Sequence, residues 1–220
     1  QPVTNADIEI NDFLKKYLKK ITPEYGWLSE ESIDDNSRNE FKSFWCLDPI
    51  DGTRSYIYRK PEFTISLALI TNNRPVLGYI YNPITEEFFF AKQNQGAFCN
   101  EKKILVNKKI ELDNCSIAAS SSEIKILEKH SFLKMKKIKK MGSIAYKIAL
   151  VAKGEIDIAI SFTKKNDWDL AAADLVLAEA GGEIRSIYSG KIIYNTKNLL
   201  IDSVIASNAL LVEKLKEALE

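Results

Sequence analysis

The sequence predicts an α/β protein whose first half is of the α+β type. Two observations lead to this fold class. In the first half, short apolar runs are separated by short turn-like segments, which is typical of an antiparallel sheet. In the second half, strand-like and helix-like segments alternate, which indicates an α/β layer. We place the division after residue 112, so that residues 1–112 and 113–220 form the two predicted halves.

The first half is expected to begin with a helix and to continue as a sheet. Thr4 or Asn5 is suited to cap a helix that runs to about Ile21, because apolar residues recur at helical spacing across this segment. Runs rich in aromatic and β-branched residues then predict four strands, Phe44–Asp48, Phe63–Thr71, Val76–Asn82 and Glu87–Ala91.

The second half is expected to alternate between strands and helices. Strands are predicted at Ser116–Ser120, Ile156–Ser161 and Ser203–Ser207. Helices are predicted at Ser143–Lys153, at Asp169–Ala180, and from a cap at Asn208 to about Leu219. Gly181 and Gly182 follow the second of these helices, and glycine is the residue that most commonly ends a helix.

Composition excludes several classes of partner. The chain has 31 basic and 30 acidic residues, a balance that gives no reason to expect a nucleic acid polymer or a membrane as partner. It contains no apolar run of about 18 residues and no secretory signal. Cys46, Cys99 and Cys115 lack the spacing of a metal site, so we expect buried thiols in a cytoplasmic protein. His130 is the only histidine, which leaves little material for histidine-based catalysis.

The segment Asp48-Pro49-Ile50-Asp51-Gly52-Thr53 directly follows an apolar run that ends at Leu47. A strand that turns at Pro49 would place Asp48 and Asp51 side by side. Two such carboxylates repel one another unless a cation lies between them. Mg²⁺ typically binds one or two carboxylates together with phosphate oxygens, and the backbone after Gly52 is suited to approach an anion closely. The segment therefore predicts a site for metal and phosphate. The alternative is that Asp-Pro and Asp-Gly only mark two successive turns.

A second acidic segment lies far along the chain, at residues 166–173. Asp169 is expected in the first turn of a helix, where the helix dipole stabilises a carboxylate. The alternative for this segment is a capped helix whose small residues pack on a sheet.

The order of these motifs resembles that of the inositol monophosphatase superfamily, whose members are magnesium-dependent and often lithium-sensitive phosphomonoesterases. Two further segments support the resemblance, Pro2–Asp7 and Trp27–Ser32. The resemblance implies a layered αβαβα sandwich of the inositol monophosphatase and fructose-1,6-bisphosphatase type. Family members have another helix and a mobile loop before the position of Pro2, so we expect this chain to lack that helix.

The resemblance also implies roles for individual residues. Two or three Mg²⁺ ions are expected, and their implied ligands are Glu30, Asp48, Asp51, Asp169 and the main-chain carbonyl of Ile50. Asp7 and Thr53 are implied to activate the attacking water, with Glu30 and Asp51 in the same catalytic group, and Glu31 is implied to support it. The residues expected to bind substrate are Asp51, Gly52, Thr53, Gly142, Ser143, Lys164, Lys165 and Asp169.

Within the superfamily, the chain most resembles a bacterial branch labelled 3′(2′),5′-bisphosphate nucleotidase or inositol monophosphatase-like. The implied reaction converts adenosine 3′,5′-bisphosphate to AMP. Lys164 and Lys165 could meet the extra phosphate or could simply face solvent. Inositol-specific members carry a glutamate at the position of Phe162. Inositol 1-phosphate, histidinol phosphate and fructose bisphosphate remain alternative substrates, and a non-catalytic phosphate-binding relative is an alternative of another class. Relatives suggest a homodimer.

Overall fold

A computed structural model describes residues 2–127 and 137–219 of the chain. His130 therefore lies outside the described residues. Within those two ranges, no helix combines the length and the apolar character needed to cross a membrane.

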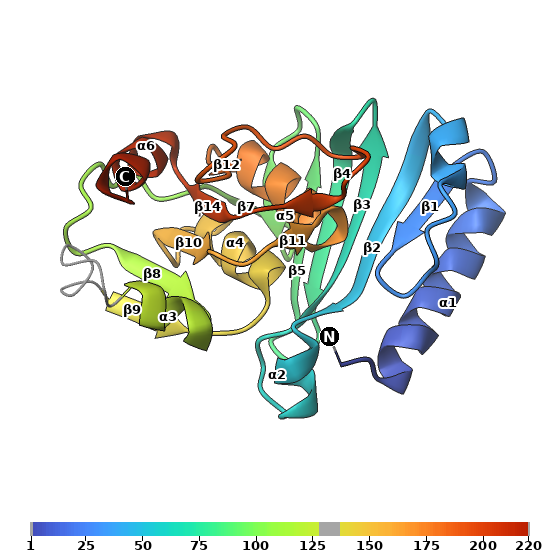
Figure 1. Ribbon diagram of the computed structural model, residues 1–220, viewed down its shortest axis with the longest axis horizontal. Helices are drawn as coiled ribbons and strands as arrows, with labels where there is room; N and C mark the ends of the chain where they lie inside the picture. Colours follow the sequence, from blue (N-terminus) through green and yellow to red (C-terminus); the bar gives the residue numbers. More distant parts are fainter. Residues whose placement is uncertain (1, 128–136, 220) are drawn as a thin grey trace.

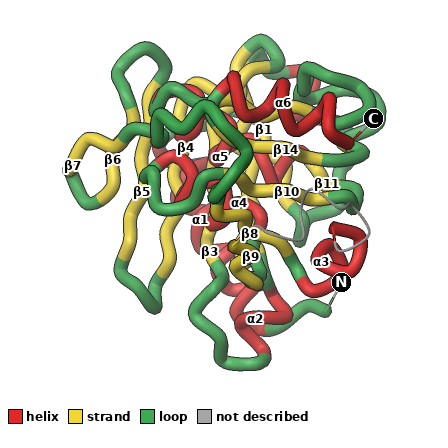
Figure 2. Tube along the Cα trace, turned by 90° about the vertical axis from the view of Figure 1, so that its left-hand side faces the viewer, coloured by secondary structure: helices red, strands yellow, loops and turns green. Residues whose placement is uncertain are grey.

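The structure consists of five layers in the order helix, sheet, helix, sheet, helix (Figure 1). Helix α1 (Asn5–Ile21) covers the outer face of the first sheet. Helices α4 (Ile144–Ala152) and α5 (Asp167–Glu179) fill the space between the two sheets. Helix α6 (Ala209–Leu219) lies on the outer side of the second sheet, on the side that faces the viewer in Figure 2, and helix α3 (Ser121–Leu127) contacts strand β9 (Lys137–Lys140) of that sheet. The predicted layered αβαβα sandwich is confirmed.

The first sheet, as far as the described residues define it, has seven strands in sequential order. They are β1 (Gly26–Ser29), β2 (Ser43–Asp51), β3 (Thr64–Thr71), β4 (Arg74–Asn82), β5 (Glu87–Lys92), β6 (Ala97–Cys99) and β7 (Lys102–Ile104). The sheet is antiparallel from β2 onward, as predicted, but β1 runs parallel to β2. Parallel neighbours need a connection of about a dozen residues. Residues 30–42, which include the short helix η1 (Ser37–Glu40), provide that connection.

The second sheet has five strands among the residues that the structure describes. In spatial order they are β12 (Glu183–Arg185), β14 (Val204–Ser207), β10 (Ile158–Ser161), β8 (Ser116–Ala119) and β9 (Lys137–Lys140). A separate pair joins β11 (Lys165–Asn166) to β13 (Leu200–Ile201). The largest apolar cluster contains residues from both sheets, from Leu28 to Ala206. The division into two halves after residue 112 stays a prediction.

Strand β2 ends in a β-bulge, which corrects the expected turn at Pro49. Asp48 pairs with Ser66 on β3. Asp51 pairs with Thr64, so an advance of three residues along β2 is matched by an advance of only two residues along β3. In a regular strand, residues three apart point to opposite faces of the sheet. The extra residue of the bulge instead lets Asp48 and Asp51 share a face. The strand continues through Pro49, and the bulge, in place of a turn, brings Asp48 and Asp51 to the same side of the sheet.

Helix α1 spans the predicted residues, but much of its apolar stripe is not buried. Leu14 and Leu18 pack against the first sheet. Phe13 and Tyr17 are 68% and 55% exposed, and their rings stack on one another with centroids 6.4 Å apart. The helical spacing of apolar residues therefore predicts the helix correctly without showing which of these residues enter the core.

Helix α5 is buried between the two sheets, and its close packing fixes the position of its first turn. Leu170–Ala173 are at most 1% exposed. Gly78 on β4 lies against this segment, because a Cβ atom at Gly78 would be only 2.7 Å from the carbonyl oxygen of Ala172. The alanines and the glycine let the helix approach the sheet closely. This contact sets where Asp169, at the start of α5, lies relative to β2.

Candidate metal and phosphate site

Three carboxylates from two distant parts of the sequence meet at one end of the first sheet. Asp48 and Asp51 come from the bulged end of β2, and Asp169 comes from the first turn of α5. One carboxylate oxygen of each lies within 4.8 Å of the corresponding oxygen of the other two. All three residues are buried, with at most 7% of their surface exposed. We call this group the acidic cluster.

The acidic cluster is electrostatically unfavourable without a cation. Burial raises the pKa of Asp48 well above its usual range, and the negative charges of Asp51, Asp169 and Glu30 raise it further. Burial, followed by the charge of Asp51, raises the pKa of Asp169 to about 7. Within the described ranges, Asp48 Oδ1 is buried without a hydrogen-bond partner. A buried oxygen of this kind beside two other carboxylates fits a hard divalent cation, which takes oxygen ligands.

Asp51 is held in place by the beginning of α4. Its Oδ2 atom accepts hydrogen bonds from Ser143 Oγ and from the backbone N–H of Ala145, both at 2.6 Å. Burial raises the pKa of Asp51, and these two bonds oppose that rise. Ser143, which was expected to bind substrate, thus also orients a carboxylate of the acidic cluster.

Glu30 and Glu31 lie directly after β1, beside the acidic cluster. The backbone N–H of Glu30 donates to the carbonyl of Leu47 at 3.2 Å, which aligns this segment with β2. Burial and then the charge of Asp169 raise the pKa of Glu30 to about 7. Burial and then the charge of Asp7 raise the pKa of Glu31. Glu30 is close enough to interact with the acidic cluster, although it does not belong to the three residues within 4.8 Å.

The residues expected to activate water make hydrogen bonds close to their own place in the sequence. Thr53 Oγ1 donates to the carbonyl oxygen of Ile50 at 3.0 Å. Asp7 is buried, and its Oδ2 accepts from the backbone N–H and the hydroxyl of Thr4 at 2.7 and 2.6 Å. The charge of Asp7 contributes to the raised pKa of Glu30, which places Asp7 near the same site. The roles of Asp7, Thr53 and Ile50 stay predictions.

Two glycines permit the close approach of the chain segments around the site. Gly52 has φ +96°, and a Cβ atom there would lie 2.9 Å from the carbonyl oxygen of Glu62. A Cβ atom at Gly142 would collide with the hydroxyl of Ser55. The helices α4 and α5 both begin at the acidic cluster, and the positive ends of their dipoles favour an anion there. The expected binding of phosphate at Gly52 and Gly142 stays a prediction.

The two lysines before α5 differ in position. Lys165 is half-buried, and its charge opposes the rise in the pKa of Asp51 and Asp169, so it lies near the acidic cluster. Its Nζ donates to Thr163 Oγ1 at 2.7 Å. Lys164 is exposed. Their expected contact with a second phosphate stays a prediction.

The sequence analysis missed a buried ion pair next to the site. Lys147 Nζ lies 3.2 Å from Glu123 Oε2, with side-chain exposures of 3% and 2%. The charge of Lys147 also opposes the rise in the pKa of Asp51. The two residues are 24 positions apart and belong to no motif, so the sequence carries no signal for the pair. Asp167, which is buried with its pKa raised to about 7 by that burial, was also missed.

A layered sandwich with a buried acidic cluster beside two helix N-termini is the architecture of a metal-dependent enzyme that acts on phosphate esters. Comparison with known proteins gives the family. The model of the inositol monophosphatase family matches residues 1–220, and the chain belongs to this family. Its members are magnesium-dependent phosphatases, so the chain is a phosphoric monoester hydrolase that acts on small phosphorylated substrates.

Individual relatives carry several different names. The 3′(2′),5′-bisphosphate nucleotidase CysQ of Aggregatibacter actinomycetemcomitans is 32% identical, over 91% of this chain and 78% of that relative. The fructose-1,6-bisphosphatase/inositol-1-monophosphatase of Thermotoga maritima is 30% identical, over 95% and 78%. The crystal structure of the extragenic suppressor protein suhB from Bartonella henselae superposes with a TM-score of 0.88 at 30% identity, over 99% and 84%.

Proposed function

We propose that this protein is a Mg²⁺-dependent 3′(2′),5′-bisphosphate nucleotidase that converts adenosine 3′,5′-bisphosphate to AMP. Its phosphatase class follows from the family, and the CysQ relative supports this substrate. The observation that carries the proposal is the buried acidic cluster, in which Asp48 Oδ1 has no hydrogen-bond partner in the described part of the chain.

The proposed metal ligands are Glu30, Asp48, Asp51, Asp169 and the Ile50 carbonyl, for two or three ions. Bound Mg²⁺ would neutralise phosphate oxygens, acidify a water molecule and stabilise the leaving alkoxide. The chain itself positions the reactants. Backbone N–H groups at Gly52 and Thr53 would bind phosphate oxygens. The hydroxyl oxygen of Thr53 would accept a hydrogen bond from the attacking water, and the carboxylate of Asp7 would take up the proton that the water loses. No protein nucleophile is needed, so positioning and electrostatics dominate the catalysis.

Phe162 supports a nucleotide over a polyol as substrate. Its ring is half-buried and packs against the apolar cluster of the second sheet. It therefore offers no carboxylate for binding sugar hydroxyls at this position. Inositol 1-phosphate is the second candidate substrate, because the Thermotoga maritima relative carries an inositol-1-monophosphatase name. Histidinol phosphate, a purely phosphate-binding role, lithium sensitivity, a cytoplasmic location and a homodimer stay predictions.

A phosphate-release assay with and without Mg²⁺ tests the proposal. Adenosine 3′,5′-bisphosphate, inositol 1-phosphate and histidinol phosphate would be compared, and we expect the first to give the highest kcat/KM.

Asp48→Asn and Asp51→Asn should each lower phosphate release about a hundredfold or more, because each removes a charge that holds the metal. Circular dichroism should show both variants to be folded. Full activity in both variants would refute the metal assignment, and equal rates for all three esters would refute the substrate.

A further inference from the structure

A cavity of about 670 Å³ is lined by residues that directly follow or precede the predicted phosphate-binding segments, among them Arg54 and Gly142. We propose that this basic cavity binds the second phosphate of a bisphosphorylated substrate, an assignment that rests on the proposed function. Its charged lining consists of Arg54, Lys60, Lys125, Lys140 and a single carboxylate, Glu62.

The basic cavity shares its wall with the metal and phosphate site. Arg54 follows Thr53 directly, and Gly142 of the cavity lining precedes Ser143, whose hydroxyl binds Asp51. Consecutive Cα atoms are about 3.8 Å apart. The backbone of Glu62, a residue of the cavity lining, also lies against both Gly52 and Gly142, so the cavity and the predicted phosphate site are neighbours. Two phosphates of one nucleotide could occupy the two places together.

The four cations of the basic cavity are available for a ligand. Of the residues that the structure describes, none forms an ion pair with the side chain of Arg54, Lys60, Lys125 or Lys140. They outnumber the one carboxylate of the lining by four to one. A phosphate dianion would supply the missing negative charge, and arginine can bind two phosphate oxygens at once.

Hydroxyl groups add donors to the same wall. Ser120, Ser121 and Ser122 line the cavity, and the hydroxyl oxygens of Ser120 and Ser122 are 3.0 Å apart. A serine hydroxyl can rotate to donate to a phosphate oxygen. Cations combined with hydroxyls are the chemistry that binds a phosphate group, in contrast to an apolar ligand.

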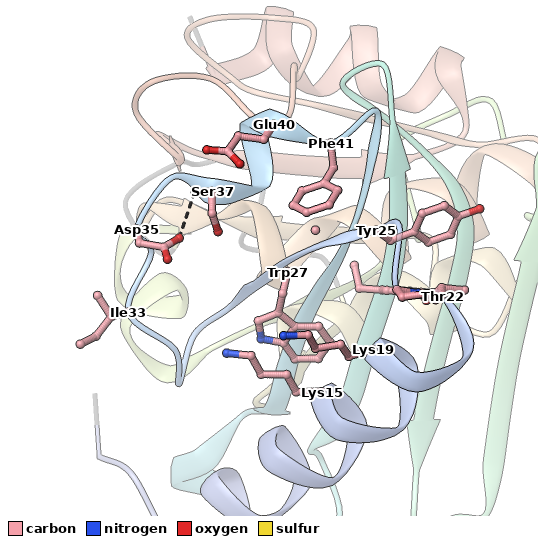
Figure 3. Close-up of a pocket in the computed structure, with 13 residues that line it drawn as sticks. Lys15, Lys19, Thr22, Tyr25, Trp27, Ile33, Asp35, Ser37, Glu40 and Phe41 are labelled. Atoms are coloured by element: carbon pink, nitrogen blue, oxygen red, sulfur yellow. Dashed lines mark hydrogen bonds between the residues drawn. The ribbon is translucent and has the colours of Figure 1, made fainter.

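A different cavity shows that this charge pattern is not general. The cavity of about 340 Å³ in Figure 3 lies between α1 and the segment after β1. Its two lysines, Lys15 and Lys19, are matched by Asp35 and Glu40, and Trp27 contributes an aromatic ring. That cavity has balanced charges and contains no residue of the acidic cluster. Unlike that cavity, the basic cavity combines excess positive charge with residues adjacent in sequence to the predicted phosphate site.

The basic cavity does not include Lys164 or Lys165, the two lysines that the sequence analysis expected to bind the second phosphate. Both lysines precede α5. The two possibilities therefore predict different sensitive residues, which mutagenesis can separate.

Calorimetric titration with 5′-AMP and with adenosine, in the absence of metal, tests the basic cavity directly. Without metal the acidic cluster repels phosphate, so the 5′-phosphate should bind only in the basic cavity. The variant Lys125→Gln/Lys140→Gln should bind 5′-AMP at least about tenfold more weakly than the unmodified protein, and adenosine equally well. The matched control is Lys137→Gln/Lys139→Gln, which removes the same charge from β9 outside the cavity and should change binding less than about twofold.

Kinetics with Mg²⁺ separate this inference from the proposed function. The cavity variant should lose at least about tenfold in kcat/KM for adenosine 3′,5′-bisphosphate, through KM, and should keep its rate with 3′-AMP. If the unmodified protein hydrolyses neither ester but its binding of 5′-AMP depends on Lys125 and Lys140, the proposed nucleotidase activity is refuted. The assignment of the basic cavity as a phosphate-binding site is then still supported. If 5′-AMP binding is unchanged by the cavity variant, or is lost equally in the control or in Lys164→Gln/Lys165→Gln, the inference is overturned.

Discussion

Asp48 is the residue on which the site depends most. It is 1% exposed, and it shares a face of the sheet with Asp51 because of the bulge in β2. A carboxylate is moved out of water at a large cost in free energy unless a proton or a cation compensates its charge. The fold nevertheless brings Asp48, Asp51 and Asp169 together. Their negative charges destabilise the folded protein, and a bound metal ion would remove this destabilisation.

We predict that the metal-free protein loses stability as the pH rises. The folded-state pKa of Asp169 is raised from 3.8 to about 7, and that of Asp48 is raised well above 3.8. The folded protein therefore holds these protons more tightly than the unfolded chain does. The resulting contribution to stability is present below pH 4 and is lost as the pH rises through 7, by a few kcal/mol in order of magnitude.

Urea denaturation of the metal-free protein at pH 5 and pH 8 checks this prediction. Asp48→Asn removes one of the repelling charges, so this variant should be more stable than the unmodified protein at pH 8, and the difference should shrink at pH 5. Asp12→Asn, at an exposed position of α1, should show no such difference. A pH-independent effect of Asp48→Asn would contradict the account.

For individual residues, the sequence predicted which carboxylates form the site, but it did not predict the backbone conformation that brings them together. Repulsion between Asp48 and Asp51 and the resemblance to the family together indicated a metal site. The bulge was not predictable, because the alternation of side chains can be broken by a turn or by a bulge and the residues do not distinguish them. The ion pair of Glu123 with Lys147 was missed because its members are joined only by the tertiary fold.

Helix α5 is the element that connects the core to the site. Its N-terminal turn carries Asp169, whose Oδ2 accepts from the backbone N–H of Asn166 at 2.5 Å. Its middle is pressed against β4 at Gly78. A displacement of the helix at that contact would therefore move a carboxylate of the acidic cluster.

We predict that Gly78→Ala weakens both folding and metal binding. The added methyl group would lie 2.7 Å from the carbonyl oxygen of Ala172, so α5 must shift away from the sheet. Overpacking of this kind costs about 1–3 kcal/mol in the free energy of unfolding. The shift should also weaken the binding of a divalent cation, as measured by calorimetry.

Leu77→Ala is the matched control, because Leu77 packs on the α1 side of the same strand. It should lower the free energy of unfolding while leaving metal affinity unchanged. If Gly78→Ala binds metal as well as Leu77→Ala does, α5 does not position Asp169 in the way described.

Elements with a clear apolar pattern were predicted well, including the four-residue strands β8 and β14, whereas the strands of two or three residues were missed. Strand β3 and helix α1 match their expected ranges to within one residue, because each carries a full periodic pattern. Strands β6 and β7 have three residues each, and β11 and β13 have two, which is too few for a period to be recognised. Strand β1, with four residues, was also missed, although the motif that follows it pointed to Glu30.

The whole molecule brings the site together by packing two sheets around shared helices. The first sheet supplies Asp48 and Asp51, and the central helices supply Asp169 and the donors to Asp51. The parallel pairing of β1 with β2 and the meeting of Asp169 with Asp48 and Asp51 arise only at this scale. The sequence reached the meeting of the carboxylates only through the resemblance to a known family, and it did not predict the parallel pairing of β1 with β2.

Anomalous X-ray scattering from crystals soaked in Mn²⁺ tests the central claim most directly, because Mn²⁺ prefers the same oxygen ligands as Mg²⁺. The account predicts at least one strong anomalous peak within roughly 2.5 Å of an oxygen of Asp48, Asp51 and Asp169, and no such peak in Asp48→Asn crystals. An intact fold with no peak among these three carboxylates, at saturating Mn²⁺ and with phosphate present, would contradict it.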